Sequence, residues 1–138
     1  MTMTMILRIT AALAAIQGIA HGALFLSAKP RHGPAEEAVV AAMKANRFDF
    51  AGATRSYWDF YTGYGIEAAG ACLIEAVLLW QLARIAGTQP ATVRPILLLL
   101  VFANLAHIAL TARYFFYVPI VFDVALIACL GWALAMGR

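Results

Sequence analysis

The stretch Ser56-Tyr57-Trp58-Asp59-Phe60-Tyr61-Thr62-Gly63-Tyr64-Gly65-Ile66-Glu67 decides how the rest of this chain is interpreted. It combines aromatic, acidic and glycine residues, and it continues directly into an apolar segment from Ala68 to Ala83. Tyrosine and tryptophan are enriched where a transmembrane helix meets the headgroup layer. The stretch is therefore predicted to be the interfacial start of a membrane helix or, in a more specific interpretation, a lid over a cavity.

The composition also indicates a membrane environment. The 138 residues are 64% hydrophobic and 12% charged, with a mean hydropathy of +0.82, whereas soluble domains are typically about 25% charged. At roughly 20 residues per span, the length accommodates four helices and one long connection in a single domain. We therefore expect an all-α, integral membrane four-helix bundle over residues 1–138.

Four apolar segments are predicted to cross the membrane, at about residues 6–26, 65–86, 95–112 and 119–136. The first has Arg8 near its start and resembles a secretory signal, but its uncharged stretch from Ile9 to Ser27 is long for a signal core. We therefore predict a retained helix. Pro95 suits the first turn of the third span, and the aromatic cluster at 113–119 marks the last reversal of the chain.

The polar loop at residues 28–55 is the one sizeable connection. Within it, the run from Ala35 to Phe50 has glutamates at its start and basic residues at its end, which is the charge order that suits a helix dipole. Its apolar residues recur at helical spacing. We predict a short amphipathic helix on the membrane surface between spans 1 and 2. A solvent-facing helix that caps the bundle is the alternative.

Cysteine usage and charge restrict the function classes. Cys72 and Cys129 lie in apolar segments without CxxC spacing, so we interpret them as small core residues and do not expect a dithiol redox enzyme. The basic pI of about 9.1 fits attraction to anionic membrane lipids, and no nucleic-acid motif accompanies it. Basic residues occur on both sides of the predicted membrane; their density near the short ends favours cytoplasmic termini.

Polar residues recur within the four spans at a matching depth. Counting ~1.5 Å per helical residue from the side of the long loop, His21, His107 and Asp123 lie about 9 to 10 Å inside, and Glu75 and Asn104 at about 15 Å. Charged groups near the bilayer centre cost at least ~2.5 kcal/mol each, so these residues are expected to face the bundle interior or a wet cavity.

Helical spacing assigns the polar residues to faces: Gln17 with His21, Asn104 with His107 and Thr111, and Glu67 with Glu75. We predict a polar cavity in one half of the bilayer, covered by the region around Trp58 and the surface helix. Its candidate catalytic residues are Glu75, Glu67, His107 and Asp123. Its candidate ligand-binding residues are His21, Gln17, Trp58, Tyr64, Asn104 and Thr111.

Three classes of function fit this pattern, and the sequence leaves open whether the protein is an enzyme and which cofactor it uses. In the favoured class, the cavity binds an amphipathic small molecule, either a lipid, a sterol or a quinone-like compound, and exchanges protons with it. In the second, His21 and His107 ligate a haem or, with a carboxylate, a metal ion for electron transfer, although no HxxxH or HExxH spacing concentrates ligands. In the third, the protein is an accessory subunit bound to a partner membrane protein or to a second copy.

Four motifs resemble those of small uncharacterised four-span bacterial inner-membrane proteins. They are His21-Gly22 in the first span, SYWDFYTGYG at 56–65, LLWQLA at 78–83 and RYFFYVP at 113–119. The likeness covers nearly the whole chain and implies a multi-pass protein of the bacterial inner (cytoplasmic) membrane, but it implies no activity. A looser, architectural similarity is to DoxX-like proteins and to emopamil-binding, sterol-isomerase-like four-span proteins, whose cavities use membrane-buried carboxylates. Architecture of this kind does not establish function.

Overall fold

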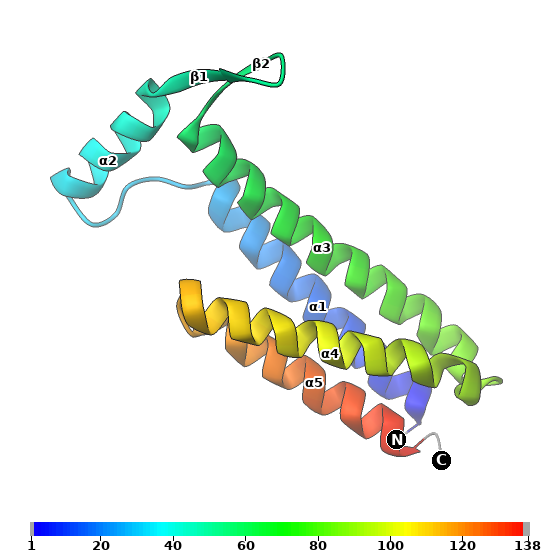
Figure 1. Cartoon of the computed structure of the whole chain (residues 1–138). Coiled ribbons are helices and arrows are strands. Elements are labelled where there is room, and N and C mark those ends of the chain that lie inside the picture. The colour runs from blue at the N-terminus through cyan, green and yellow to red at the C-terminus, as the bar shows by residue number, and fades with distance from the viewer. Residues whose placement is uncertain (1, 137–138) are drawn as a thin grey trace.

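The computed structural model describes residues 2–136, which form five helices and a short hairpin (Figure 1). In chain order the elements are α1 (Met3–Leu26), α2 (Pro34–Ala45), β1 (Arg47–Phe50), β2 (Ala53–Ser56), α3 (Tyr57–Ala86), α4 (Pro90–Tyr114) and α5 (Val118–Met136). Helices α1, α3, α4 and α5 are long and apolar enough to cross a membrane. The prediction of an all-α four-span bundle with one short additional helix is confirmed, and the fold is that of a multi-pass integral membrane protein.

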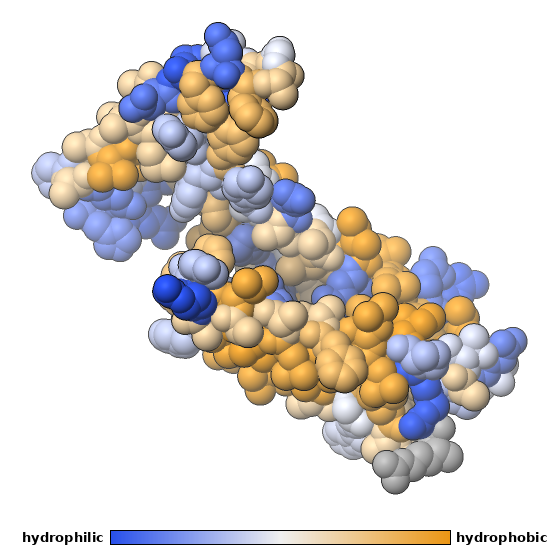
Figure 2. All heavy atoms as spheres, in the orientation of Figure 1, coloured by the Kyte–Doolittle hydropathy of each residue, from blue (hydrophilic) through white to orange (hydrophobic). Residues whose placement is uncertain are grey.

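The outer faces of the four long helices are apolar. Their exposed large side chains include Ile16 and Ile19 on α1, Ile74 and Val77 on α3, Leu99 and Phe102 on α4, and Val121 on α5. Figure 2 shows this apolar surface along the flank formed by α4 and α5. Exposing a continuous apolar surface to water is unfavourable, whereas lipid tails solvate it. The burial pattern therefore agrees with a bundle surrounded by lipid.

The long helices form two pairs, α1 with α3 and α4 with α5, which pack together at the end that holds both termini (Figure 1). Fully buried leucines, among them Leu7, Leu79, Leu97 and Leu130, form the core at this end. Toward the opposite end the two pairs separate, and Figure 2 shows a hollow between them with hydrophilic atoms inside. The bundle is closed at one end and open at the other.

Small residues bring α1 and α3 close together. A Cβ atom on Gly18 would lie 3.0 Å from the carbonyl oxygen of Ala69, and one on Gly65 would overlap the ring of Phe25. Transmembrane helices commonly pack through glycine because its lack of a side chain lets the two backbones approach. These positions therefore fix the register of the α1–α3 pair.

Helix α3 begins at Tyr57, eight residues before the predicted span. Ser56 is its N-cap and forms a capping box with Asp59: the Asp59 amide donates to Ser56 Oγ (3.2 Å), and the Ser56 amide donates to Asp59 Oδ2 (2.7 Å). This arrangement satisfies amides that have no partner within the helix. The 30 residues of α3 extend ~45 Å at 1.5 Å each, whereas the hydrocarbon core is ~30 Å thick. The first turns of α3 therefore extend beyond the hydrocarbon.

The connection between α1 and α3 differs from the prediction in its second half. Helix α2 ends at Ala45 instead of continuing to Phe50, and the following residues form an antiparallel hairpin in which Arg47 pairs with Ser56. The turn residues Ala51 and Gly52 have φ values of 49° and 80°, as a two-residue type I′ turn requires. In Figure 1, α2 lies beyond the end of the bundle and runs across the direction of α3, the orientation expected of a helix on a membrane surface.

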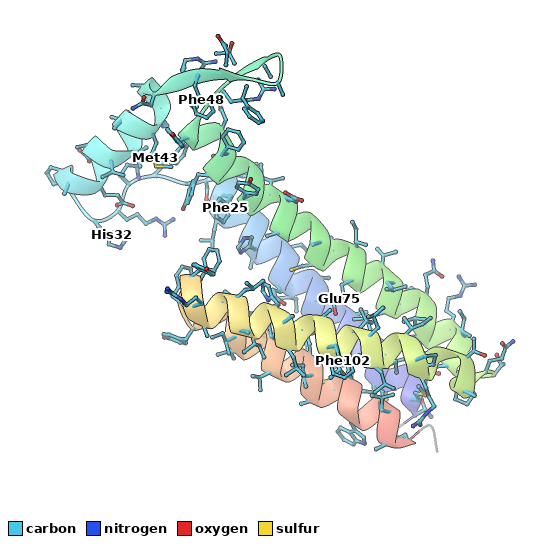
Figure 3. All side chains as sticks on the ribbon, in the orientation of Figure 1. Phe25, His32, Met43, Phe48, Glu75 and Phe102 are labelled. Carbon is cyan, nitrogen blue, oxygen red and sulfur yellow. The ribbon has the colours of Figure 1, made fainter. Side chains whose placement is uncertain are left out.

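A carboxylate orders the turn that precedes α2. Glu36 Oε2 accepts hydrogens from the backbone amides of His32 (2.6 Å) and Arg31 (2.5 Å). Hydrogen bonds to a carboxylate stabilise its charged form. The amide of His32, and to a smaller extent that of Arg31, therefore hold the pKa of Glu36 below its ordinary value. The His32 ring lies beside the same oxygen (Nδ1 to Oε2, 3.1 Å), and Figure 3 shows His32 on the loop that leads into α2.

Candidate functional site: a polar network inside the bundle

The centre of the site is a hydrogen-bonded pair between α4 and α5. His107 Nδ1 lies 2.9 Å from Asp123 Oδ2. The Asp123 side chain is only 2% exposed, whereas that of His107 is 48% exposed. An ionised carboxylate only accepts hydrogen bonds, so an ionised Asp123 requires the hydrogen on Nδ1 of His107. This leaves Nε2 as the ring nitrogen that is free to bind or release a proton.

Helix α1 contributes a third member to this pair. Gln17 Nε2 donates a long hydrogen bond of 3.5 Å to Asp123 Oδ1, and Gln17 is itself buried. Both carboxylate oxygens of Asp123 therefore have a partner, one on α1 and one on α4. Because a buried polar group without a partner is costly, the three side chains favour one arrangement of α1, α4 and α5.

A second hydrogen bond joins α3 to α4. Asn104 Nδ2 lies 2.9 Å from Glu75 Oε1 and also 2.9 Å from the carbonyl oxygen of Leu100, one turn earlier on α4. Figure 3 shows Glu75 between α3 and α4. Together the two hydrogen-bonded groups include residues from all four long helices, and we refer to them as the intramembrane network.

The network lies between the two contrasting ends of the bundle. On the side of the termini it adjoins the apolar core, in which Leu79 follows Glu75 by one turn and Leu126 follows Asp123 by three residues, and both leucines are fully buried. On the other side the helix pairs separate around the hollow of Figure 2. The polar groups are thus closed off from the end that holds the termini and lie toward the open end.

The remaining predicted site residues lie outside these hydrogen bonds. His21 is half-buried, with its ring centroid 5.0 Å from that of Phe25. Thr111 is buried one turn beyond His107 on α4. Each therefore lies one helical turn from a member of the network, His21 from Gln17 on α1 and Thr111 from His107 on α4.

Three predicted residues are placed at the surface instead. Glu67 and Tyr64 are exposed and line a pocket of about 320 Å³ on the outer side of α3. Trp58 packs against Tyr61, with Lys44 Nζ of α2 4.7 Å from its ring centroid, beside a second pocket of about 250 Å³ between α2 and α3. The structure does not bring these residues to the intramembrane network.

No dedicated metal centre is formed by the described residues. In the range 2–136, no three His, Cys, Asp or Glu side chains converge in a way that could hold a metal ion. The side chains of the network are of types that can exchange protons. The network contains two carboxylates, one imidazole with a free nitrogen, and two carboxamides that donate to the carboxylates.

The fold and this network together define a class: a small four-span membrane protein with hydrogen-bonded ionisable residues inside its bundle. Comparisons with protein-family models, with curated proteins and with solved structures find no match.

Sequence reasoning missed the partners that surround Glu67. Arg55, Asp59 and Phe60 line the same surface pocket. The available signal was the spacing of Phe60, Tyr64 and Glu67, which places them on one face of a helix once that helix is known to begin at Tyr57.

Proposed function

We propose that this protein binds the polar end of an amphipathic small molecule, a lipid, sterol or quinone-like compound, at the intramembrane network. The hydrogen-bonded pair of His107 and Asp123 carries this proposal. A buried carboxylate on one ring nitrogen orients the imidazole and stabilises its protonated form, so the other nitrogen can exchange a proton with a bound group. His107 would make that exchange through Nε2.

The position of the network supports an amphipathic ligand. The polar groups lie inside the bundle, beyond the apolar core on the side where the helix pairs separate, whereas the outer helix faces are apolar. A molecule with one polar end would place that end at His107 and Glu75 and leave its apolar part between the separated helices. Ionisable residues inside a membrane are costly and are typically retained for ligand or proton pathways.

Glu75 has a second, supporting role in the proposal. Its oxygen Oε1 accepts from Asn104, and Oε2 is left for a ligand hydroxyl, amine or water. Glu75 and His107 would then act on the same ligand from α3 and α4. The architectural similarity to four-span proteins with carboxylate-lined cavities fits this arrangement, as does a location in the bacterial inner membrane with the termini in the cytoplasm.

The test is ligand-dependent thermal stabilisation of the purified protein. Host-membrane lipids would be separated into quinone, neutral-lipid and phospholipid fractions, and each would be titrated into wild-type protein, His107→Gln and the control Arg113→Gln, a change in an exposed residue on the same helix. A ligand that binds only the folded state stabilises it by about 2.7 kcal/mol at 100 times its Kd.

We expect one fraction to raise the Tm of wild type and of Arg113→Gln in a saturable way, with little effect on His107→Gln. Equal responses in wild type and His107→Gln, or no response to any fraction, would contradict the proposed site.

The electron-transfer alternative rests on His21 and His107, which lie on different helices at a similar estimated depth. A visible absorption band in protein purified from its own membrane, lost in the His21→Ala, His107→Ala double variant, would favour it over the proposal above.

A further inference from the structure

A second cluster of charged and aromatic residues lies on the outer face of α3, near its first turns. It forms the pocket of about 320 Å³ lined by Arg55, Asp59, Phe60, Gly63, Tyr64 and Glu67. The four members from Phe60 onward follow i, i+3, i+4, i+7 spacing and therefore share one face of the helix. The opposite face of α3 packs against α1 through Gly65 and Ala69. This pocket thus opens away from the bundle, independently of the intramembrane network.

The pocket holds an arginine and a glutamate that form no ion pair with each other. Arg55 Nη1 donates to the carbonyl oxygen of Thr54 (2.9 Å), and the ion pairs found within residues 2–136 both involve histidine. Asp59 is occupied by its capping box with Ser56. Glu67 makes no hydrogen bond to another side chain in this range of the chain. The pocket thus offers a guanidinium for an anionic group and a free carboxylate for a cationic group. A ligand that carries both charges would match it.

Aromatic rings form the wall beside the acidic residues. The ring centroids of Phe60 and Tyr64 are 6.2 Å apart, at an interplanar angle of 32°. Cations, including ammonium groups of ligands, bind favourably to the faces of such rings. The aromatic wall therefore selects a cation on the side of the pocket where Glu67 lies.

The depth of the pocket points to a lipid. Glu67 is 19 residues from the far end of α3 at Ala86, which is ~29 Å at 1.5 Å per residue and matches the ~30 Å hydrocarbon thickness. The pocket then lies at headgroup level. Below it, the same helix face continues with Ile74, seven residues beyond Glu67 and 71% exposed, so acyl chains would run along an apolar surface.

We propose that this pocket binds the headgroup of a zwitterionic phospholipid of the phosphatidylethanolamine type. Arg55 contacts the phosphate, Glu67 contacts the ammonium group, and the ring of Tyr64 covers the ammonium. This pocket shares no residue with the intramembrane network, and it would bind a different chemical group. The assignment of the pocket therefore does not depend on what the network binds.

Lipid competition measured by native mass spectrometry tests this assignment. Delipidated full-length protein would be placed in mixed micelles with equimolar dioleoyl-phosphatidylethanolamine and dioleoyl-phosphatidylglycerol, and the first bound lipid would be identified. An exposed ion pair corresponds to at most about a fivefold preference, so we expect wild type to favour the ethanolamine lipid about three- to fivefold. Glu37→Gln, which removes the same charge from α2 outside the pocket, serves as the control and is expected to keep this ratio.

The variants separate the two halves of the headgroup. Glu67→Gln is expected to lower the preference to about one, Glu67→Lys to invert it toward phosphatidylglycerol, and Arg55→Gln to weaken both lipids because both contain the phosphate. The assignment is overturned if wild type shows no preference, if Glu67→Gln keeps the wild-type ratio, or if Glu37→Gln loses it equally.

Discussion

The hydrogen bond between His107 and Asp123 makes a quantitative prediction about stability. We consider the double-mutant cycle of Asp123→Ala and His107→Ala, in which each single change removes the 2.9 Å contact between Nδ1 and Oδ2. The cycle cancels the costs that each change has by itself, such as the lost hydrogen bond from Gln17 to Asp123. What remains is the interaction free energy of the pair.

The expected magnitude follows from the burial of the two partners. Hydrogen bonds between transmembrane helices average about 0.6 kcal/mol, with a maximum near 1.7, whereas bonds to charged groups contribute about 1.5 to 3 kcal/mol in proteins generally. Asp123 is 2% exposed, but the His107 side chain is 48% exposed, so solvent or headgroups weaken the interaction from one side. We expect about 1.5 kcal/mol, near the upper end of the membrane range.

Reversible unfolding by SDS in mixed micelles, followed by far-UV circular dichroism, gives the free energies. The control cycle combines Asp123→Ala with Arg94→Ala. Arg94 Nη1 binds the carbonyl oxygen of Leu134 (2.8 Å), which is 11 residues, or ~16 Å along α5, from Asp123. The control pair is expected to be additive within about 0.5 kcal/mol. An equally small coupling for His107 and Asp123 would refute the buried pair and the orientation of the imidazole that depends on it.

Three further changes address the helix contacts and the connection. Gly18→Ala is expected to lower the free energy of unfolding by about 1 to 3 kcal/mol, because its Cβ would lie 3.0 Å from the backbone of α3; SDS titration measures it. Ser56→Ala removes the capping box of α3 and is expected to cost about 1 kcal/mol, seen as faster amide exchange in the first turn of α3. The depressed pKa of Glu36 predicts that its stabilisation of the turn is complete above the ordinary pKa and is lost as pH falls through the lower, folded-state value. The NMR shift of the His32 amide is expected to follow this transition.

Each of these changes has its own control. Gly70→Ala places a Cβ in open space, so it is expected to be neutral or stabilising by up to about 1 kcal/mol; equal losses at Gly18 and Gly70 would show that α1 and α3 do not pack as described. Unchanged exchange in Ser56→Ala would contradict the capping role. A His32 amide shift that titrates identically in Glu36→Gln would mean that another group causes the transition.

The four long helices follow from hydropathy alone, since each is a long apolar segment bounded by polar residues and turns. Depth counting selected Asn104, His107, Asp123 and Glu75, and helical spacing added Gln17; the structure joins these residues by hydrogen bonds. The reason is physical: polar groups at one depth in a bilayer have no partner other than each other. Whether these residues act on a ligand stays a prediction.

The assignment of polar residues to helix faces was less accurate for residues that are two or more turns apart, because the angular error grows with each turn. Glu67 and Glu75 were predicted to line one face, but eight residues at 100° each leave them ~80° apart. This rotation places Glu75 toward α4 and Glu67 in the outer pocket. His21 was predicted to lie at the same depth as His107, but it forms no hydrogen bond with the network in the described residues. Depth counting along each helix does not account for the separation of the helix pairs at this end.

The hairpin and the early start of α3 were not visible in hydropathy. The segment from Arg47 to Phe50 alternates polar and apolar residues as a strand does, but four residues are too few to distinguish a strand from the end of a helix. Its turn uses Ala51-Gly52 in place of the more diagnostic Asn-Gly. The first turns of α3 are polar and aromatic, so a search for apolar segments begins only at Gly65. The capping box of Ser56 and Asp59 was the local signal for the true start.

Binding of an amphipathic molecule at the intramembrane network is tested most directly by native mass spectrometry of the wild-type protein, extracted gently from its own membrane. We expect one mass increment per chain that matches an amphipathic molecule, survives stripping of the bulk lipids and disappears in His107→Gln. A bare chain, or an increment unaffected by His107→Gln, would contradict it.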